Sequence, residues 1–205
     1  MCSSLGMRIR RVLPAGLAIA VVAAVAATAP ASATQRYRYP LNGAHNYGDL
    51  AVTGFGVKRA DGTIHLGQDI IANCGTPIVA VHDAVVKSAG YSKGYGNYVV
   101  LGGKGTRFDF VYGHMKGRSW KRTGKKVRAG QRLGAVGQTG SDSGVCHLHF
   151  ELWSGRWFDG GHRIDPLPHL QAWDKFSGGP LQQEPVPPPG EYSAASERLF
   201  YDAAE

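Results

Sequence analysis

The spacing of the apolar residues limits how this chain can fold more than any other feature of its sequence. Apolar side chains alternate over short stretches, such as 78–81, 98–101 and 108–114, and glycines interrupt them. After the first 33 residues, no stretch of ten or more shows an apolar stripe of helical period. The 29 glycines among 205 residues are about twice the usual share, which suits tight turns between strands. The pattern predicts an all-β fold, either an antiparallel sandwich or a barrel-like domain.

The first 33 residues have the order of a secretory signal peptide. Arg8, Arg10 and Arg11 precede the apolar run 13–29, and the small-residue cleavage site Ala31-Ser32-Ala33 follows it. An uncleaved membrane anchor is less favoured, because the run is short for a bilayer span and rich in alanine. We therefore expect a secreted or cell-wall protein, with no stable membrane insertion after the signal is cleaved.

The charge distribution indicates an anionic partner. Removal of residues 1–33 takes three arginines and no acids from a chain of net charge +8, which leaves +5. Residues 116–132 alone carry eight lysines and arginines and no acid. Such a run is often only a solvated face, but in an exported protein it favours anionic wall polymers and argues against nucleic acid.

Two cysteines, Cys74 and Cys146, remain after signal cleavage. In an oxidising compartment two cysteines most simply form one disulfide. Cys146 is also a conceivable zinc ligand, because it precedes His147. In a strand, however, Cys146 points away from the face that carries His147 and His149, so the disulfide is favoured.

The segment 146–152 carries the strongest sign of a functional site. Strict alternation places His147, His149 and Glu151 on one strand face and Leu148, Phe150 and Leu152 on the other. The apolar face is explained as core. Three titratable groups on the opposite face favour a site over a merely solvated strand face.

His65 and Asp69 form a second candidate pair. Four extended residues span about 13 Å, too far for two ligands of one metal ion, so the chain must bend between them. Gly67 is where it bends most cheaply. Two histidines, one aspartate and an open position describe a catalytic zinc site. The sequence lacks the H-E-x-x-H motif of helical metalloproteases, which excludes that type of site.

Seven motifs in a fixed order give the chain a family resemblance. They are His65–Asp69, Gly75–Ala80, Gly94–Asn97, Tyr112–Met115, Val127–Gln131, Gly134–Gly140 and His147–Glu151. This string resembles the lysostaphin/LytM group of zinc metalloendopeptidases, which cut peptide bonds in bacterial peptidoglycan. The resemblance covers residues 52–170 and implies an all-β fold, a two-sheet, mostly antiparallel, sandwich-like domain with long loops around a zinc groove.

The resemblance implies a role for each candidate residue. His65, Asp69 and His149 would bind one Zn²⁺ ion per chain in a groove between the loops, and His114 and His147 would be the catalytic histidines. The expected function is that of a secreted zinc-dependent endopeptidase that hydrolyses peptidoglycan as a monomer, through zinc-activated water. The alternative is a non-enzymatic LytM-like domain that binds the cell wall or activates another hydrolase. Degenerate domains of that kind lose metal ligands, whereas all five positions are filled here.

The expected domain organisation has four parts. A signal peptide occupies residues 1–33, an N-terminal extension residues 34–51, and the peptidase domain residues 52–175. Residues 176–205 form a proline-rich, acidic tail that we expect to be disordered.

Overall fold

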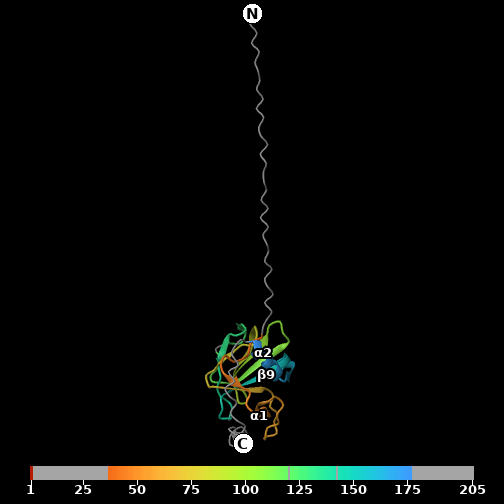
Figure 1. The fold of residues 1–205 in the computed structure, drawn as a ribbon. Coiled ribbons are helices and arrows are strands. Elements are labelled where there is room, and N and C mark those ends of the chain that lie inside the picture. Colours follow the sequence, from red (N-terminus) through yellow and green to blue (C-terminus); the bar gives the residue numbers. More distant parts are fainter. Residues whose placement is uncertain (2–36, 120, 142, 177–205) are drawn as a thin grey trace. The chain divides into compact units, whose positions relative to one another are not determined.

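The computed structural model describes Met1 and residues 37–119, 121–141 and 143–176 (Figure 1). The expected signal peptide from its second residue onward, and the tail from residue 177, lie outside these described residues. Within them, no helix has both the length and the apolar character needed to cross a membrane.

The described chain consists mainly of antiparallel strands. The elements are, in order, β1 (His45–Asn46), α1 (Leu50–Thr53), β2 (Gln68–Ala72), β3 (Pro77–Val79), β4 (Ala84–Ser92), β5 (Gly96–Gly103), β6 (Phe108–Met115), β7 (Lys126–Val127), β8 (Arg132–Ala135), β9 (His147–Arg156), β10 (Asp159–Ile164) and α2 (Leu167–Phe176). The larger sheet has the order β1-β2-β9-β6-β5-β4-β7, with β10 paired to β9, and the smaller sheet pairs β3 with β8. The predicted two-sheet, mostly antiparallel fold is confirmed.

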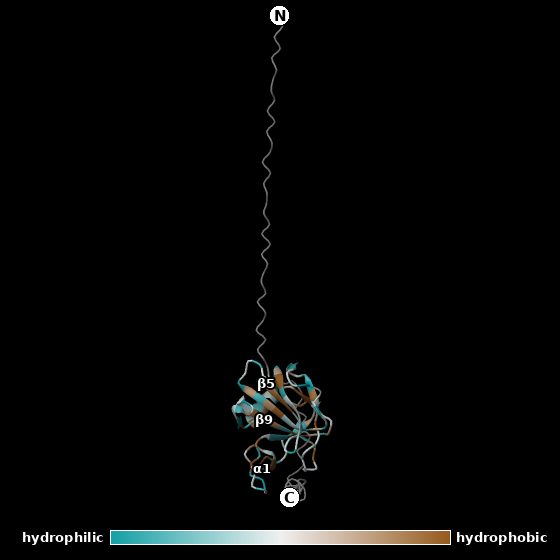
Figure 2. Cartoon of the chain, turned by 180° about the vertical axis from the view of Figure 1, so that it is seen from behind, coloured by the Kyte–Doolittle hydropathy of each residue, from teal (hydrophilic) through white to brown (hydrophobic). Residues whose placement is uncertain are grey.

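Strand β9 is the central element, because it pairs with β2, β6 and β10. Its side chains Leu148, Phe150 and Leu152 are fully buried in the main hydrophobic core, as the alternation predicts. Figure 2 shows the apolar and polar residues alternating along the strands of this sheet. The opposite face of β9 is left for the polar residues of the candidate site.

Helix α2 is the main element that the apolar pattern did not predict. Among the helix residues whose burial the structure describes (167–175), Leu170 and Trp173, three residues apart, are the buried ones. Trp173 lies edge-on to Phe110 and Phe150, with ring centroids 6.3 and 6.2 Å away. Two apolar anchors in one short helix are too few to form a recognisable stripe.

Part of the expected N-terminal extension, residues 34–51, contributes to this core. Tyr39 and Leu41 are buried in it, and β1 pairs with the outer edge of β2. Strand β2 is therefore held on both sides, by β1 and by β9.

The structure contains the expected disulfide. Cys74 follows β2 and Cys146 immediately precedes β9, and the bond joins them with their Cα atoms 5.2 Å apart. The bond therefore lies beside the end of the β2–β9 pairing at Ile71 and His147.

Candidate metal centre and active-site cleft

Two strands and one loop bring His65, Asp69 and His149 together. Asp69 on β2 and His149 on β9 are directly paired across the ladder, so their side chains start as neighbours. His65 lies in the loop before β2, where main-chain hydrogen bonds to Val57 and Gly56 fix its position, both 2.8 Å long. All three side chains are buried, with at most 6% of each residue exposed.

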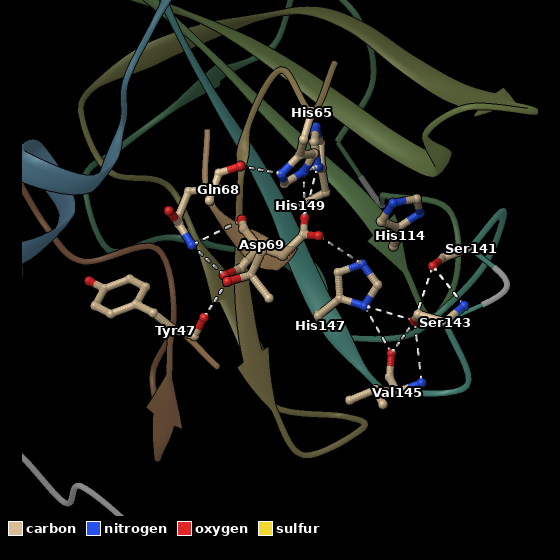
Figure 3. Close-up of polar contacts among 12 residues, drawn as sticks. Tyr47, His65, Gln68, Asp69, His114, Ser141, Ser143, Val145, His147 and His149 are labelled. Atoms are coloured by element: carbon tan, nitrogen blue, oxygen red, sulfur yellow. Dashed lines mark hydrogen bonds and ion pairs between the residues drawn. The ribbon is translucent and has the colours of Figure 1, made fainter. Parts of the chain in front are cut away.

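The donor atoms of these residues converge on one point, as Figure 3 shows. His65 Nε2 lies 3.0 Å from His149 Nδ1, and Asp69 Oδ1 lies 2.9 Å from His149 Nδ1 and 3.2 Å from His65 Nε2. In a tetrahedral zinc site with bonds near 2.0–2.1 Å, neighbouring ligand atoms are about 3.3 Å apart. The three distances come close to that spacing, and two nitrogens with one carboxylate oxygen are donors that zinc prefers. The residues therefore fit a zinc ion.

Position 67 requires glycine, because the neighbouring atoms leave no space for a side chain. A Cβ atom at this position would lie 2.6 Å from His149 Cε1 and 2.8 Å from the carbonyl oxygen of Phe150. The sequence suggested Gly67 as the cheapest place to bend the chain. The structure adds a second reason, because any side chain here would push the His149 ring away from Asp69.

His114 and His147, expected as catalytic residues, lie beside the three candidate ligands (Figure 3). His147 Nδ1 donates a hydrogen bond to the Val145 carbonyl at 2.9 Å, and its Nε2 is 3.9 Å from Asp69 Oδ2. The ring centroid of His114 is 4.8 Å from that of His147 and 5.7 Å from that of His149. The structure thus brings all five predicted site residues into one cluster.

A local irregularity in β6 aims the His114 side chain. The register between β5 and β6 shifts between Asn97 and Val99, and His114 has a positive φ of 54°. Bulges of this kind redirect a side chain, and backbone in the left-handed region is unfavourable for a residue other than glycine. Two hydrogen bonds hold it there, from His114 N to the Tyr95 carbonyl at 2.7 Å and from His114 Nδ1 to the Thr139 carbonyl at 2.8 Å.

The surroundings keep His114 and His147 neutral. Burial, together with the imidazoles of His147 and His149, lowers the pKa of His114 to about 3. Burial also lowers the pKa of His147, outweighing the opposite effect of Asp69. Because the Nδ1 atom of each donates to a carbonyl, each presents an unprotonated Nε2 near neutral pH.

Glu151, which shares the strand face of His147 and His149, belongs to the same cluster. Its Oε1 is 3.5 Å from His149 Nε2 and accepts a hydrogen bond from the Tyr95 hydroxyl at 3.0 Å. Its Oε2 accepts a hydrogen bond from Trp153 Nε1 at 2.7 Å, and Arg163 Nε is 3.0 Å from Oε1. Tyr95 and Arg163 were not singled out from the sequence, because only the pairing of β10 with β9 and the β5–β6 register bring them here.

A cleft of about 340 Å³ opens over the cluster and gives a substrate access to it. Its lining includes all five predicted residues together with Arg59, Tyr95, Glu151 and Arg163. Arg59 was likewise not singled out from the sequence, since a lone arginine in a polar loop carries no recognisable signal.

Several known proteins with similar sequences or structures are peptidases. ShyC, a peptidoglycan DD-endopeptidase from Vibrio cholerae, is 41% identical over 88 residues, which are 43% of this chain but only 20% of that protein. The catalytic domain of the antimicrobial peptidase lysostaphin from Staphylococcus simulans has a TM-score of 0.51 and 30% identity, covering 62% of this chain and 91% of that domain. A zinc-containing peptidase from Vibrio cholerae has a TM-score of 0.53 and 26% identity, covering 64% of this chain and 39% of that one.

The family assignment rests on more than these pairwise similarities. The sequence model of peptidase family M23 matches residues 63–166, slightly more than half of the chain. That range contains every residue of the His65, Asp69, His114, His147 and His149 cluster. The resemblance to the lysostaphin group is therefore confirmed, and the chain belongs to peptidase family M23.

Proposed function

We propose that this chain is a secreted zinc-dependent endopeptidase that hydrolyses peptide bonds in bacterial peptidoglycan. The observation that carries the proposal is the convergence of His65 Nε2, Asp69 Oδ1 and His149 Nδ1 to within 3.2 Å of one another beneath an open cleft. The similarity to ShyC, a peptidoglycan DD-endopeptidase, supports the substrate, and the similarity to the zinc-containing peptidase supports the metal.

The roles of the residues follow from their geometry. His65, Asp69 and His149 would hold one zinc ion, which when bound supplies Lewis acidity to activate water and polarise the scissile carbonyl. His114 and His147 each direct an unprotonated Nε2 toward the cluster. One of them accepts the proton of the attacking water. The other, after taking up a proton from solvent through the open cleft, donates to the oxyanion or to the leaving amine.

A non-enzymatic domain that binds the wall or activates another hydrolase is the alternative function. A binding module has no need of two neutral imidazoles beside a buried His-Asp-His set, nor of the unfavourable backbone conformation at His114. These features favour the enzyme.

The same proposal includes a partner for the basic surface, defined as the lysines and arginines of residues 116–132. Seven of these eight side chains are exposed: Lys116, Arg118, Arg122, Lys125, Lys126, Arg128 and Arg132. Arg118, Lys121 and Arg122 line a hollow of about 390 Å³. We propose that anionic wall polymers bind this surface and hold the enzyme, as a monomer, on its substrate.

One experiment separates enzyme from module. The purified chain is assayed for zinc content and then incubated with peptidoglycan, while new amino termini are counted. We expect one zinc per chain, release of amino termini, loss of this release after chelation and its return on adding zinc. Binding to peptidoglycan without new amino termini would establish the module instead, and equal cleavage by the chelated protein would contradict the zinc mechanism.

A further inference from the structure

The four histidines of the cluster differ in what fixes their rings. In His65, His114 and His147, Nδ1 donates to a main-chain carbonyl, of Gly54, Thr139 and Val145 respectively, at 2.8, 2.8 and 2.9 Å. In His149, Nδ1 faces Asp69, and the remaining nitrogen, Nε2, faces the Glu151 carboxylate at 3.5 Å. The orientation of His149 therefore depends on a side chain rather than on the backbone.

Glu151 is itself held firmly. It is 2% exposed, its two oxygens accept hydrogen bonds from Trp153 Nε1 and the Tyr95 hydroxyl, and the Arg163 guanidinium forms an ion pair with Oε1 at 3.0 Å. The Arg163 guanidinium lies 4.4 Å from the centroid of the Trp153 ring, which fixes the arginine in turn. With His149 Nε2, three donors and one cation surround the carboxylate. Only a group with acceptors on both atoms satisfies all of them.

We propose that Glu151 is a positioning residue that fixes the ring and the tautomer of His149, so that His149 presents an unprotonated Nδ1 to a metal ion. This inference rests on the proposed function. A carboxylate that accepts the Nε2 proton keeps that proton on Nε2 and increases the electron density at Nδ1. Because Nδ1 and Nε2 point to different sides of the ring, Glu151 does this without approaching Asp69 or His65.

A purely structural role for Glu151 makes a different prediction. Through Tyr95 and Arg163, Glu151 also ties β9 to the loop before β5 and to β10. If that were its only role, its loss would lower the melting temperature and leave the affinity of the folded protein for zinc unchanged.

The test is Glu151→Gln, which keeps the shape of the side chain but replaces one acceptor by an NH₂ group. Zinc affinity is measured by competition with a chelator of known affinity, on full-length protein. We expect the affinity to fall about 10–100-fold, the usual cost of losing such an outer partner. We also expect hydrolysis to recover at saturating zinc, because Glu151 acts through His149 and not on the substrate. In the metal-free protein, at a pH above 9 where the His149 ring is neutral, nitrogen NMR should show His149 losing its preference for the Nε2-protonated form.

Asp109→Asn is the matched control. Asp109 is another buried carboxylate of the same sheet, 5% exposed, and it pairs with Lys87 and accepts a hydrogen bond from the Trp157 main chain. Its change to an amide should lower the melting temperature and leave zinc affinity within about twofold of the original. If Glu151→Gln does not fold, Trp153→Phe removes one donor to Glu151 and should weaken zinc binding about threefold.

The outcomes are separable. Unchanged zinc affinity in a folded Glu151→Gln or Trp153→Phe protein overturns the positioning role, as does an equal loss in Asp109→Asn. Failure of the original protein to bind zinc overturns the proposed function as well.

Discussion

His147 and His149 lie two residues apart on one face of β9, yet their contacts assign them different roles. His149 Nδ1 is 2.9 Å from Asp69 Oδ1, whereas His147 Nε2 is 3.9 Å from Asp69 Oδ2. We expect His149→Ala to be metal-poor and inactive, because it loses a ligand atom. His147→Ala should keep its zinc and lose about 10²–10⁴-fold in rate, the usual contribution of a proton-transfer group. The zinc content and peptidoglycan hydrolysis of both variants test this assignment. Loss of zinc from His147→Ala with zinc retained in His149→Ala would exchange the two roles.

The stability of the metal-free protein should depend on pH through His149. Burial alone lowers the pKa of His149, but its contacts with Asp69 and Glu151 prevail and raise it to about 9. The folded state therefore binds this proton more tightly than the unfolded state, whose histidine titrates near 6.5. The resulting stabilisation is complete below about pH 6.5 and is lost as the pH rises through about 9.

Thermal melts of the chelated protein at pH 6.5, 7.5, 8.5 and 9.5 test this dependence. The melting temperature should fall across the series. His149→Gln, which cannot titrate, serves as the control and should show a shallower fall. Parallel curves for the two proteins would show that another group is responsible.

At the scale of elements, the close approach of the loop before β2 to β9 determines the geometry of the candidate centre. Gly67→Ala would place a Cβ atom 2.6 Å from the His149 ring, so we expect weaker zinc binding. Gly94→Ala is a matched control, because it also lines the cleft but its Cβ would meet no atom within 4 Å. Zinc affinities of the two variants should differ clearly. Equal affinities would mean that the His149 ring can move without cost.

The alternating pattern of β9 shows how far the sequence could predict the site. Strand geometry alone predicted that His147, His149 and Glu151 share one face, and the family resemblance added the roles of His147 and His149. The contacts of Glu151 with Tyr95 and Arg163 could not be predicted, since they depend on pairings between strands far apart in sequence. Helix α2 was not predicted for a different reason: within its residues 167–175, whose burial is described, Leu170 and Trp173 alone are buried.

At the scale of the domain, the basic surface and the candidate metal centre lie in different places. β7, which carries Lys126, ends the order of the larger sheet four strands from β9, which corresponds to about 19 Å at normal strand spacing. A polymer bound along this edge would leave the cleft accessible.

Charge reversal tests the basic surface. Lys125→Glu/Lys126→Glu should weaken binding to walls that retain their anionic polymers, most clearly at low salt, because exposed charges are screened by ions. Lys58→Glu/Lys104→Glu changes the net charge equally at exposed positions outside the basic surface and should bind nearly as the original does. Cosedimentation with intact and polymer-stripped walls measures the difference. Equal loss in both variants would show that only net charge matters.

The disulfide between Cys74 and Cys146 makes the stability of the folded protein depend on the redox state of the compartment in which it folds. It fastens the β2–β9 ladder at its Ile71–His147 end, two residue pairs from Asp69 and His149, where an untied strand end would fray. In the chain-entropy account, closing a loop across the 72-residue separation contributes about 4 kcal/mol. Cys74→Ser should therefore melt at a lower temperature and bind zinc less tightly, and unchanged zinc affinity would contradict this coupling. Cytoplasmic thiols stay reduced, so under the secretion proposed above the metal site would reach its full rigidity after export, when the disulfide forms.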